Sequence, residues 1–391
     1  METRAMKKIV FLTGTRAEFG KMKPLIQAVR DSGLFDVRLF VTGMHMSTKY
    51  GRTVEEIIKL DFPNIYQYDN QAEHGTMDSI LANTIGGFST YIKDDRPDLI
   101  VVHGDRVEAL AGAIVGVLNN ILVSHIEGGE LSGTVDEIIR HAVSKLVHLH
   151  FTANDESKLR LIQMGESERN IFILGSPDLD IMSSPHLPSL EDTKSRYEIP
   201  FDRYAVLIYH PITTELPHLA AQTYMLVDTL LETDIPYIVI YPNNDHGSDI
   251  ILEIYQKKLY EHPRFKIFPS LLFEHFLTLL KHALFIIGNS SAGVREAPFY
   301  GVPTINVGTR QHNRINPRFN ESIFHVFYET DALKELITRF AKEPVRFIPN
   351  LYFGDGKSTE RFLHTLSNER IWETKIQKQF LDTFTRFDDV Y

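Results

Sequence analysis

Short apolar runs alternate along most of the chain with longer stretches in which apolar residues recur every three or four positions. The short runs have the length of buried strands, and the longer stretches have the periodicity of helices that bury one face. Strands that alternate with helices are typical of βαβ units, whose strands lie parallel in one sheet. In the first half, we expect strands at 8–13, 37–41, 98–103, 121–124, 149–152 and 171–175, and helices at 19–32, 107–118, 136–146 and 157–164.

The same pattern begins again after residues 183–189, which are rich in proline and serine and which we interpret as a linker. The sequence therefore predicts an α/β protein of two Rossmann-like domains that face a central cleft, the first at 1–182 and the second at 183–368. The chain ends with the pattern of an amphipathic helix from Glu369 to Phe387. In the second half, we expect strands at 204–209, 237–241, 284–287 and 302–307, and helices at 216–231, 248–260 and 293–300.

Polar and glycine-containing clusters follow the predicted strands in both halves. "GTR" follows the first strand, "HGDR" a later one, and "HIEGGELSGTVDEIIRHAVSK" the next, and the second half adds "NNDH" and "GNSS". Ionisable groups at this density are costly to bury unless they are paired. In parallel sheets, ligands bind beyond the carboxyl ends of the strands, so these clusters indicate a binding cleft rather than a solvated surface.

Composition narrows the class of protein. The chain has 391 residues, of which 43% are hydrophobic and 24% charged, as in ordinary globular proteins. It has no cysteine, which excludes disulfides, zinc–thiolate sites and cysteine nucleophiles. A net charge of −10 argues against nonspecific nucleic-acid binding. No apolar run is long enough to span a membrane and no signal peptide is evident, so we expect a cytoplasmic protein without nucleic-acid or membrane partners.

The segment "GTRAEFGKM" resembles a phosphate-binding P-loop only superficially. Five residues separate its two glycines instead of four, and Met22 stands where serine or threonine would bind magnesium. What remains is a strand-to-helix turn whose N–H groups and Arg16 suit an anion. The alternative is a plain turn with a surface arginine. No Gly-x-Gly-x-x-Gly follows the first strand, so we expect no nicotinamide or flavin cofactor.

Metal motifs are weak in this sequence. Asp178 and Asp180 fit the loose Asp-x-Asp pattern of metal-dependent sugar transfer, but the pattern is short, and we interpret it as a helix cap near the linker. The 17 histidines include no His-Glu-x-x-His spacing. We therefore expect no metal.

The segment "GNSSAGVRE" places two hydroxyls at a predicted helix N-terminus. Backbone N–H groups with Ser290 and Ser291 suit a diphosphate, and Glu296 could accept hydrogen bonds from two ribose hydroxyls. The alternative is a capped helix with a solvent-facing Glu296.

The segment "TVDE" fits a capping box, with Thr134 as the N-cap and Glu137 reaching back. That role for Glu137 leaves Asp136 in the same first turn available for chemistry. At a spacing of four residues, Arg140 can pair with Asp136, and His141 can pair with Glu137.

Six segments together resemble the hydrolysing UDP-N-acetylglucosamine 2-epimerases of sialic-acid biosynthesis, over nearly the whole chain. They are also similar to the epimerase half of the bifunctional animal epimerase/N-acetylmannosamine kinase. Non-hydrolysing relatives carry a different sequence at the segment that begins with His125. The six segments are "GTRAEFGKMKP", "HGDRVEAL", "HIEGGELSGTVDEIIRHAVSKL", "GSPDLDIM", "YPNNDHGS" and "GNSSAGVREAPFYGVPTINVGTRQ".

The resemblance implies a glycosyltransferase-B-like fold, with a C-terminal helix at 369–391 that packs back on the first domain. It implies no metal and no nicotinamide, and we expect a homodimer or homotetramer. It also implies two sets of site residues. The catalytic set is Asp105, Glu127 and Asp136, with Glu137, His45 and His210 as further cleft residues. The UDP-binding set is Arg16, Arg106, His210, Asn243, Ser290, Ser291, Glu296 and Arg310.

The implied reaction converts UDP-N-acetylglucosamine and water to N-acetylmannosamine and UDP, through elimination of UDP and hydration of 2-acetamidoglucal. Bases and acids are needed on both faces of the sugar ring, which explains several carboxylates. Two alternatives stay open. One is hydrolytic 2-epimerisation of a UDP-2,4-diacetamido-2,4,6-trideoxyhexose on the legionaminic-acid route. The other is a sugar transferase of the same fold, and a noncatalytic UDP-sugar sensor is a weaker third interpretation.

Overall fold

The computed structural model describes residues 6–71, 75–132, 135–311, 314 and 321–382. The chain forms two compact units. The first unit contains residues 1–130, 136–181 and 353–391, and the second contains 131–135 and 182–352. Each unit is an α/β layer structure around its own parallel sheet, which confirms the predicted pair of Rossmann-like domains.

The first unit is built on a seven-stranded sheet, counted over the described residues, with the order β3-β2-β1-β4-β5-β6-β7. From β1 the chain runs outward to β2 and β3 and then returns to β4, so the order reverses between β1 and β4. Such a reversal is where ligands bind in open α/β sheets. The strands are Lys7–Thr13 (β1), Phe35–Val41 (β2), Ile65–Gln67 (β3), Leu99–His103 (β4), Leu122–Ile126 (β5), Leu149–Thr152 (β6) and Ile171–Ile173 (β7).

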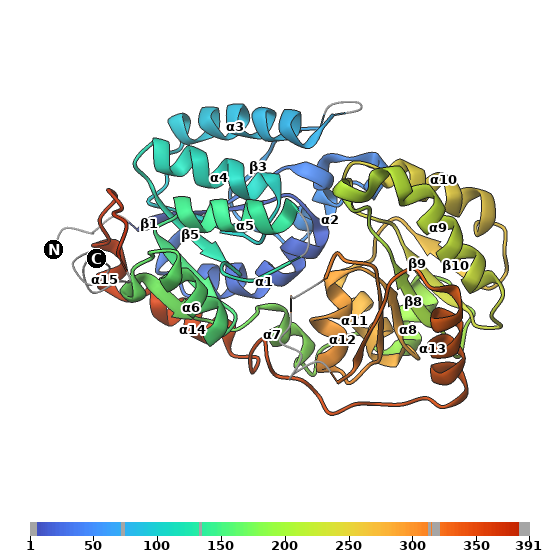
Figure 1. The fold of residues 1–391 in the computed structure, drawn as a ribbon. Helices are drawn as coiled ribbons and strands as arrows, with labels where there is room; N and C mark the ends of the chain where they lie inside the picture. The colour runs from blue at the N-terminus through green and yellow to red at the C-terminus, as the bar shows by residue number, and fades with distance from the viewer. Residues whose placement is uncertain (1–5, 72–74, 133–134, 312–313, 315–320, 383–391) are drawn as a thin grey trace, which may run out of the picture. The chain divides into compact units, whose positions relative to one another are not determined.

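Helices cover both faces of this sheet. Helices α3, α4 and α5 lie on one face and α1 and α14 on the other (Figure 1). The central strands are buried on both faces, which explains their continuous apolar runs. The helices are Arg16–Asp31 (α1), Val54–Ile58 (α2), Met77–Asp94 (α3), Val107–Leu118 (α4), Val135–Leu146 (α5), Asp155–Gln163 (α6), Asp178–Met182 (α7), Ser358–Leu366 (α14) and Glu369–Trp372 (α15).

The second unit has a parallel sheet of its own with the order β10-β9-β8-β11-β12-β13, which reverses between β8 and β11. Helices α9, α10 and α13 lie on one face, and α8, α11 and α12 on the other (Figure 1). The strands are Ala205–Ile208 (β8), Tyr237–Ile240 (β9), Phe265–Phe268 (β10), Ile286–Gly288 (β11), Thr304–Val307 (β12) and Ile323–Val326 (β13). The helices are Leu190–Arg196 (α8), Leu216–Leu231 (α9), Ser248–Lys258 (α10), Phe273–His282 (α11), Glu296–Phe299 (α12) and Thr330–Lys342 (α13).

The C-terminal part of the chain differs from its prediction. The chain rejoins the first unit at Phe353 rather than at residue 369. Helix α15 spans Glu369–Trp372, as predicted, but residues 373–382 contain no helix, so the predicted helix from Glu369 to Phe387 is wrong over 373–382. The apolar residues of this segment instead pack against the core of the first unit, as Trp372 and Ile376 do. The helical prediction for 383–391 lies outside the described residues.

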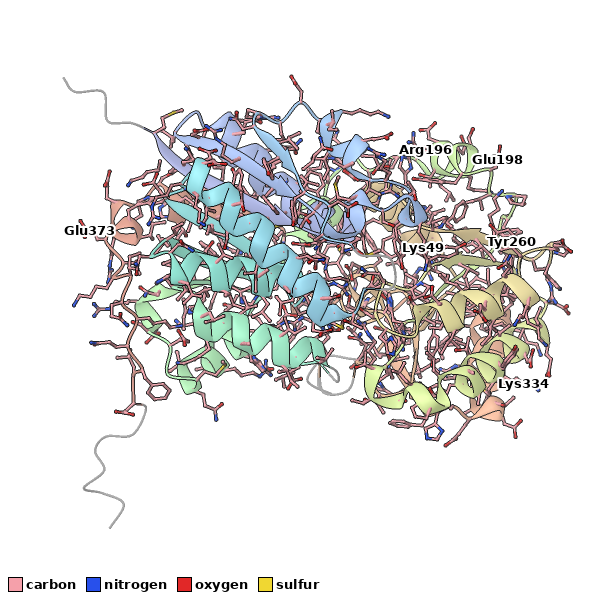
Figure 2. All side chains as sticks on the ribbon, turned by 90° about the horizontal axis from the view of Figure 1, so that it is seen from above. Lys49, Arg196, Glu198, Tyr260, Lys334 and Glu373 are labelled. Atoms are coloured by element: carbon pink, nitrogen blue, oxygen red, sulfur yellow. The ribbon has the colours of Figure 1, made fainter. Side chains whose placement is uncertain are left out.

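The surface carries ordinary solvated charges. Figure 2 shows Lys334 and Glu373 at the periphery, and Lys334 of α13 forms an ion pair with Glu232. Exposed pairs of this kind contribute little to stability. Among the described residues, no helix combines the length and the apolar character that crossing a bilayer requires.

Candidate functional site

Three of the predicted polar clusters meet at one edge of the first sheet. Strand β1 pairs with β4, and β4 pairs with β5, all in parallel. Gly14, Gly104 and Glu127 follow the carboxyl ends of these three strands. The edge lies at the reversal of strand order, where the sequence predicts ligand binding.

Glu127 is held firmly beyond the end of β5. Its side chain is buried, and its backbone has a φ of 64°, a region that few residues other than glycine adopt. Ser176 Oγ donates a hydrogen bond to Glu127 Oε1 over 2.6 Å, and His103 Nε2 lies 3.5 Å from Glu127 Oε2. Both oxygens of this carboxylate therefore face groups that can carry a proton.

Asp105 and Arg140 form a partly buried ion pair between the turn after β4 and helix α5. Arg140 is 1% exposed, and its Nη1 also lies 3.7 Å from Glu130 Oε2. The arginine that the sequence places beside Asp136 thus holds Asp105 and Glu130. This pairing attaches α5 to the β4 turn and keeps the Asp105 carboxylate in place.

The first turn of α5 carries the other two predicted carboxylates. Asp136 is buried, and Glu137 is partly exposed. His141 Nε2 lies 3.9 Å from Glu137 Oε1, as the four-residue spacing predicts. Burial lowers the pKa of His141, and the charge of Glu137 opposes that shift. Thr134 lies outside the described residues, so the predicted capping box stays a prediction.

Three buried residues at the same edge were not assigned from the sequence: Glu18, His103 and Glu108. The Gly14 N–H donates to Glu18 Oε2 over 3.0 Å, and Asn70 Nδ2 lies 3.5 Å from Glu108 Oε1. Burial raises the pKa of Glu18 to about 7, and the negative charge of Glu108 adds to that effect. Glu18 belongs to the segment "GTRAEFGKM", and His103 and Glu108 belong to "HGDRVEAL". In these two segments, the sequence analysis assigns roles only to Arg16, Asp105 and Arg106.

Two glycines make room for the Glu108 carboxyl. A Cβ on Gly14 would lie 2.9 Å from Glu108 Cδ, and a Cβ on Gly43 would lie 2.8 Å from Glu108 Oε1. Gly43 also has a φ of 64°. The turns after β1 and β2 therefore approach this side chain so closely that only glycine fits.

Both ring nitrogens of His45 lie within hydrogen-bond distance of threonine hydroxyls. Its Nε2 lies 3.1 Å from Thr13 Oγ1, and its Nδ1 lies 2.7 Å from Thr53 Oγ1. Burial, together with the charge of Arg16, lowers its pKa to about 3. The neutral His45 ring thus links the end of β1 to Thr53. The catalytic role of His45 stays a prediction.

The two arginines predicted to bind UDP in this unit occupy different environments. Arg16 is the first residue of α1, and its guanidinium pairs with Glu56, with 2.9 Å between Nε and Oε2. Arg106 is the N-cap residue of α4 and follows Asp105 directly. The Arg16 guanidinium therefore already pairs with the Glu56 carboxylate. An anion bound there would share the positive charge of Arg16 with Glu56.

Asn289 organises the corresponding edge of the second sheet. Its Oδ1 accepts from the His210 N–H over 2.6 Å, and its Nδ2 donates to the His210 carbonyl over 2.8 Å. The Asn243 N–H donates to His210 Nδ1 over 3.0 Å. His210 and Asn243 are thus brought together at the ends of β8 and β9, beside β11, through a residue that the sequence analysis did not assign.

Ser290, Ser291 and Glu296 follow β11 directly. Ser290 Oγ accepts a hydrogen bond from the Ala292 N–H over 3.3 Å, and Ser291–Gly293 form one 3-10 turn. The predicted helix at 293–300 is wrong in extent, because α12 spans only Glu296–Phe299. The solvent-facing alternative for Glu296 is also wrong, since this side chain is 2% exposed.

Arg310 completes this edge. Its Nη1 lies 3.4 Å from the Asn289 carbonyl oxygen, which also accepts from Gln311 Nε2 over 2.9 Å. The predicted nucleotide residues of the second unit therefore surround the β11 turn.

The Asp-x-Asp pattern has structural roles. Asp178 Oδ2 lies 3.2 Å from Lys21 Nζ. Asp180 accepts from the backbone N–H of Ser358 over 2.9 Å and of Thr359 over 2.7 Å, so it caps α14. Within the described residues, no group of three or more histidine and acidic side chains is placed to hold a metal ion.

Comparisons with known proteins agree with the motifs. The family described as UDP-N-acetylglucosamine 2-epimerase matches residues 27–367. The chain is 46% identical to the UDP-N-acetylglucosamine 2-epimerase of Neisseria meningitidis serogroup B, over 96% of this chain and 99% of that protein. It is 36% identical to the hydrolysing UDP-N,N'-diacetylbacillosamine 2-epimerase of Legionella pneumophila, over 91% of this chain and 94% of that protein.

Solved structures share the fold. A Methanocaldococcus jannaschii UDP-GlcNAc 2-epimerase in complex with UDP-GlcNAc and UDP has a TM-score of 0.76 at 23% identity, covering 93% of this chain and 99% of that one. A Neisseria meningitidis UDP-GlcNAc 2-epimerase bound to UDP-GlcNAc has a TM-score of 0.75 at 20% identity, covering 92% and 99%. At these identities the likeness establishes the architecture.

Proposed function

Because the chain belongs to the UDP-N-acetylglucosamine 2-epimerase family, we propose that it hydrolyses UDP-N-acetylglucosamine to N-acetylmannosamine and UDP with inversion at C2. The observation that carries the proposal is a set of three carboxylates at the β4 and β5 ends and on α5: the buried Glu127 and Asp136, and the partly exposed Asp105, which pairs with Arg140. Their burial and pairing support acid–base chemistry rather than a role in solubility. We also propose a homodimer or homotetramer.

The order of bond changes follows from the chemistry of the sugar. The C2 hydrogen is not next to a carbonyl group, so its direct removal is very difficult. Departure of UDP places positive charge at C1 and acidifies C2–H, and a carboxylate then removes the proton to give 2-acetamidoglucal. Water adds at C1, and a proton reaches C2 from the opposite face.

The residues divide between these tasks. Glu127 exchanges a proton with C2. Its two carboxylate oxygens face Ser176 and His103, which are groups that can carry a proton. Asp105 and Asp136 act on the other ring face and on water, and the fixed charge of Arg140 positions Asp105. Ser290, Ser291, Glu296, Arg310 and His210 hold UDP, the backbone turn after β11 stabilising the diphosphate.

A second substrate has a specific observation in its favour. The 36% identical Legionella pneumophila protein is a hydrolysing epimerase of UDP-N,N'-diacetylbacillosamine. The same elimination and hydration would apply to that sugar. We place UDP-N-acetylglucosamine first because the Neisseria meningitidis relative is 46% identical over nearly the whole chain.

The decisive experiment supplies both UDP-sugars without an acceptor, in D₂O, and identifies the released sugar by NMR. We expect N-acetylmannosamine fully deuterated at C2, with free UDP. Protium retained at C2 would exclude elimination, and a sugar with its original configuration would indicate a simple hydrolase or a transferase. Glu127→Gln, Asp105→Asn and Asp136→Asn should each lower turnover by at least about a hundredfold while UDP affinity stays nearly intact.

Metal independence is tested in the same assay. Exhaustive chelation should leave turnover unchanged, because Asp178 and Asp180 are engaged with Lys21 and α14. Loss of activity in EDTA, with recovery in magnesium, would contradict this expectation.

A further inference from the structure

Two buried groups near the Glu127 carboxylate, His103 and Glu18, have no proton-transfer step of their own in the reaction as described above. His103 ends β4, and its side chain is 5% exposed. Its Nε2 is buried and has no hydrogen-bond partner among the described residues, but it lies 3.5 Å from Glu127 Oε2. A buried imidazole nitrogen without a hydrogen bond is costly unless it has a use.

Glu18 lies near the end of β4, because the Gly14 N–H that donates to it follows β1, the strand that pairs with β4. It belongs to the first turn of α1, is 7% exposed, and accepts a hydrogen bond from the Gly14 N–H. A positive charge on His103 lowers the pKa of Glu18, whereas burial raises it. Glu18, His103 and Glu127 come from α1, β4 and the end of β5, so the fold brings them together from three separate segments.

We propose that Glu18, His103 and Glu127 form a buried proton-transfer chain, in which His103 takes from Glu127 the proton that this carboxylate removes from the sugar. The inference rests on the proposed function, which gives Glu127 its acid–base role. His103 and Glu18 do not contact the substrate, and both act through Glu127.

The proton balance is as follows. The C2–H bond breaks, its electron pair forms the C1–C2 double bond, and UDP leaves C1 with the electrons of its bond. The proton joins Glu127 and then passes to His103 Nε2, which restores the Glu127 carboxylate. The Glu18 carboxylate stabilises the imidazolium until the proton passes to water.

Other charges near the chain set its pH dependence. Burial raises the pKa of Glu18 to about 7, a charged His103 lowers it, Glu108 raises it and Arg106 lowers it. On the neighbouring strand, His125 has a pKa lowered by burial to about 3, and His103 contributes to that shift. Glu18 is therefore ionised only above about pH 7, and kcat should fall as the pH decreases through this value.

Two variants test the chain in the full-length enzyme. Glu18→Gln should lower kcat by about tenfold or more, leave KM within about threefold, and remove the fall in kcat below pH 7, because an amide cannot stabilise the imidazolium. His103→Gln should give the same loss. His282→Gln is the matched control, since this histidine lies on α11 of the second unit and bonds the Thr278 carbonyl over 2.9 Å.

Two measurements make the result decisive. UDP affinity, measured by calorimetry, checks that each variant is folded, and His103→Asn replaces His103→Gln if the latter does not bind UDP. Carboxyl ¹³C NMR of glutamate-labelled enzyme follows Glu18 without any sugar. Its titration midpoint, about pH 7 in the wild type, should rise in the His103 variant and stay in the His282 control.

The outcomes separate the two proposals. Unchanged kcat in both variants, or an unchanged Glu18 midpoint in the His103 variant, would overturn the chain. Failure of the wild type to release a C2-deuterated sugar from either UDP-sugar would overturn the proposed function instead.

Discussion

At the scale of one residue, the backbone conformation of Glu127 has a cost in free energy. A left-handed backbone conformation costs about 1–3 kcal/mol for a residue other than glycine. The surrounding structure holds this conformation through the Glu127 N–H, which donates to the Phe151 carbonyl over 2.9 Å, and through Ser176 on the side chain. In this conformation, the carboxylate lies against Ser176 and His103 beyond the end of β5.

Glu296 gives a direct test of the nucleotide site. Glu296→Gln should weaken UDP binding by about 1–3 kcal/mol, because an amide loses the charge of the carboxylate that we propose accepts hydrogen bonds from the ribose hydroxyls. Calorimetry with UDP alone measures this loss. The exposed Glu335→Gln on α13 is the control and should bind UDP normally. Equal affinity in both variants would remove Glu296 from the site.

His45 predicts a pH dependence of stability. An unfolded histidine binds a proton near pH 6.5, whereas folded His45 binds one only near pH 3. Its contribution to stability is therefore complete above pH 6.5 and is lost as the pH falls from 6.5 toward 3. Glu18 has the opposite sign, because its raised pKa makes its contribution decrease as the pH rises from 4.5 to about 7.

The measurement is urea unfolding at pH 7 and pH 5. The wild type should lose more stability between these values than His45→Gln, by about 2 kcal/mol, the effect of one buried histidine over 1.5 pH units. A His45 variant with the same pH dependence as the wild type would show that this ring is protonated in the folded protein at pH 5.

The sequence could predict the residues that stand in motifs, but not those whose role depends on burial. Asp105 and Glu127 follow strands in recognisable segments, and the structure brings them to one sheet edge. Glu18 reads in the sequence as an ordinary first-turn acidic residue of a helix. Its raised pKa arises from burial and from the charge of Glu108, which lies far away in the chain, so no local pattern could reveal it.

At the scale of elements, the C-terminal segment fixes the end of helix α5. Lys378 Nζ donates to the carbonyl oxygens of Ser144, Lys145 and Val147 at 2.7–3.2 Å and pairs with Glu166 at 2.5 Å. Burial would raise the pKa of Glu166, but His150 and Lys378 outweigh it and lower the pKa to about 2. One lysine thus caps the helix that carries Asp136 at its other end.

Lys378→Met should lower the free energy of unfolding by about 2–3 kcal/mol, because it leaves helix carbonyls and a buried carboxylate with fewer partners. Thermal or urea unfolding measures the change. The control is Lys375→Met in the same segment, which should change stability by less than about 0.5 kcal/mol. Equal effects would mean that the segment contributes only through apolar contacts.

The strands that the sequence analysis did not predict lie at the sheet edges, whereas the helices it did not predict include the long helices α3, α11 and α13. Strand β6 was predicted at its observed bounds, and β1 within one residue. Strands β3, β10 and β13 were not predicted, and each lies at the edge of its sheet. A strand with one neighbour is less buried and needs no continuous apolar run, so its pattern is weak.

At the scale of the whole molecule, the first unit is closed by a distant part of the chain. Helix α14 packs on α1, and the ring of Phe362 lies 4.8 Å from that of Phe151 and 6.3 Å from that of Phe11. Phe362 is fully buried in the first core. The second unit has its own core, to which Phe340 contributes.

Phe362→Ala should destabilise the first unit by about 3–5 kcal/mol through loss of buried area and a cavity. The single tryptophan, Trp372, lies in that unit, so its fluorescence follows unfolding of the first unit alone. Phe340→Ala is the matched control. It should shift the circular-dichroism transition of the second unit and leave the tryptophan transition in place. Equal shifts of both signals in both variants would mean that the units unfold together.

The return of the chain at Phe353 has a consequence during translation. The second unit is almost contiguous, at residues 182–352, whereas the first needs Phe362, Leu366 and Ile371 to complete its core. A ribosome therefore makes the whole second unit before it makes the last core residues of the first. Domains that fold during synthesis usually fold from the N-terminus onward. In this chain, the first unit cannot complete its core until α14 and α15 emerge, so we expect the second unit to be able to fold before it.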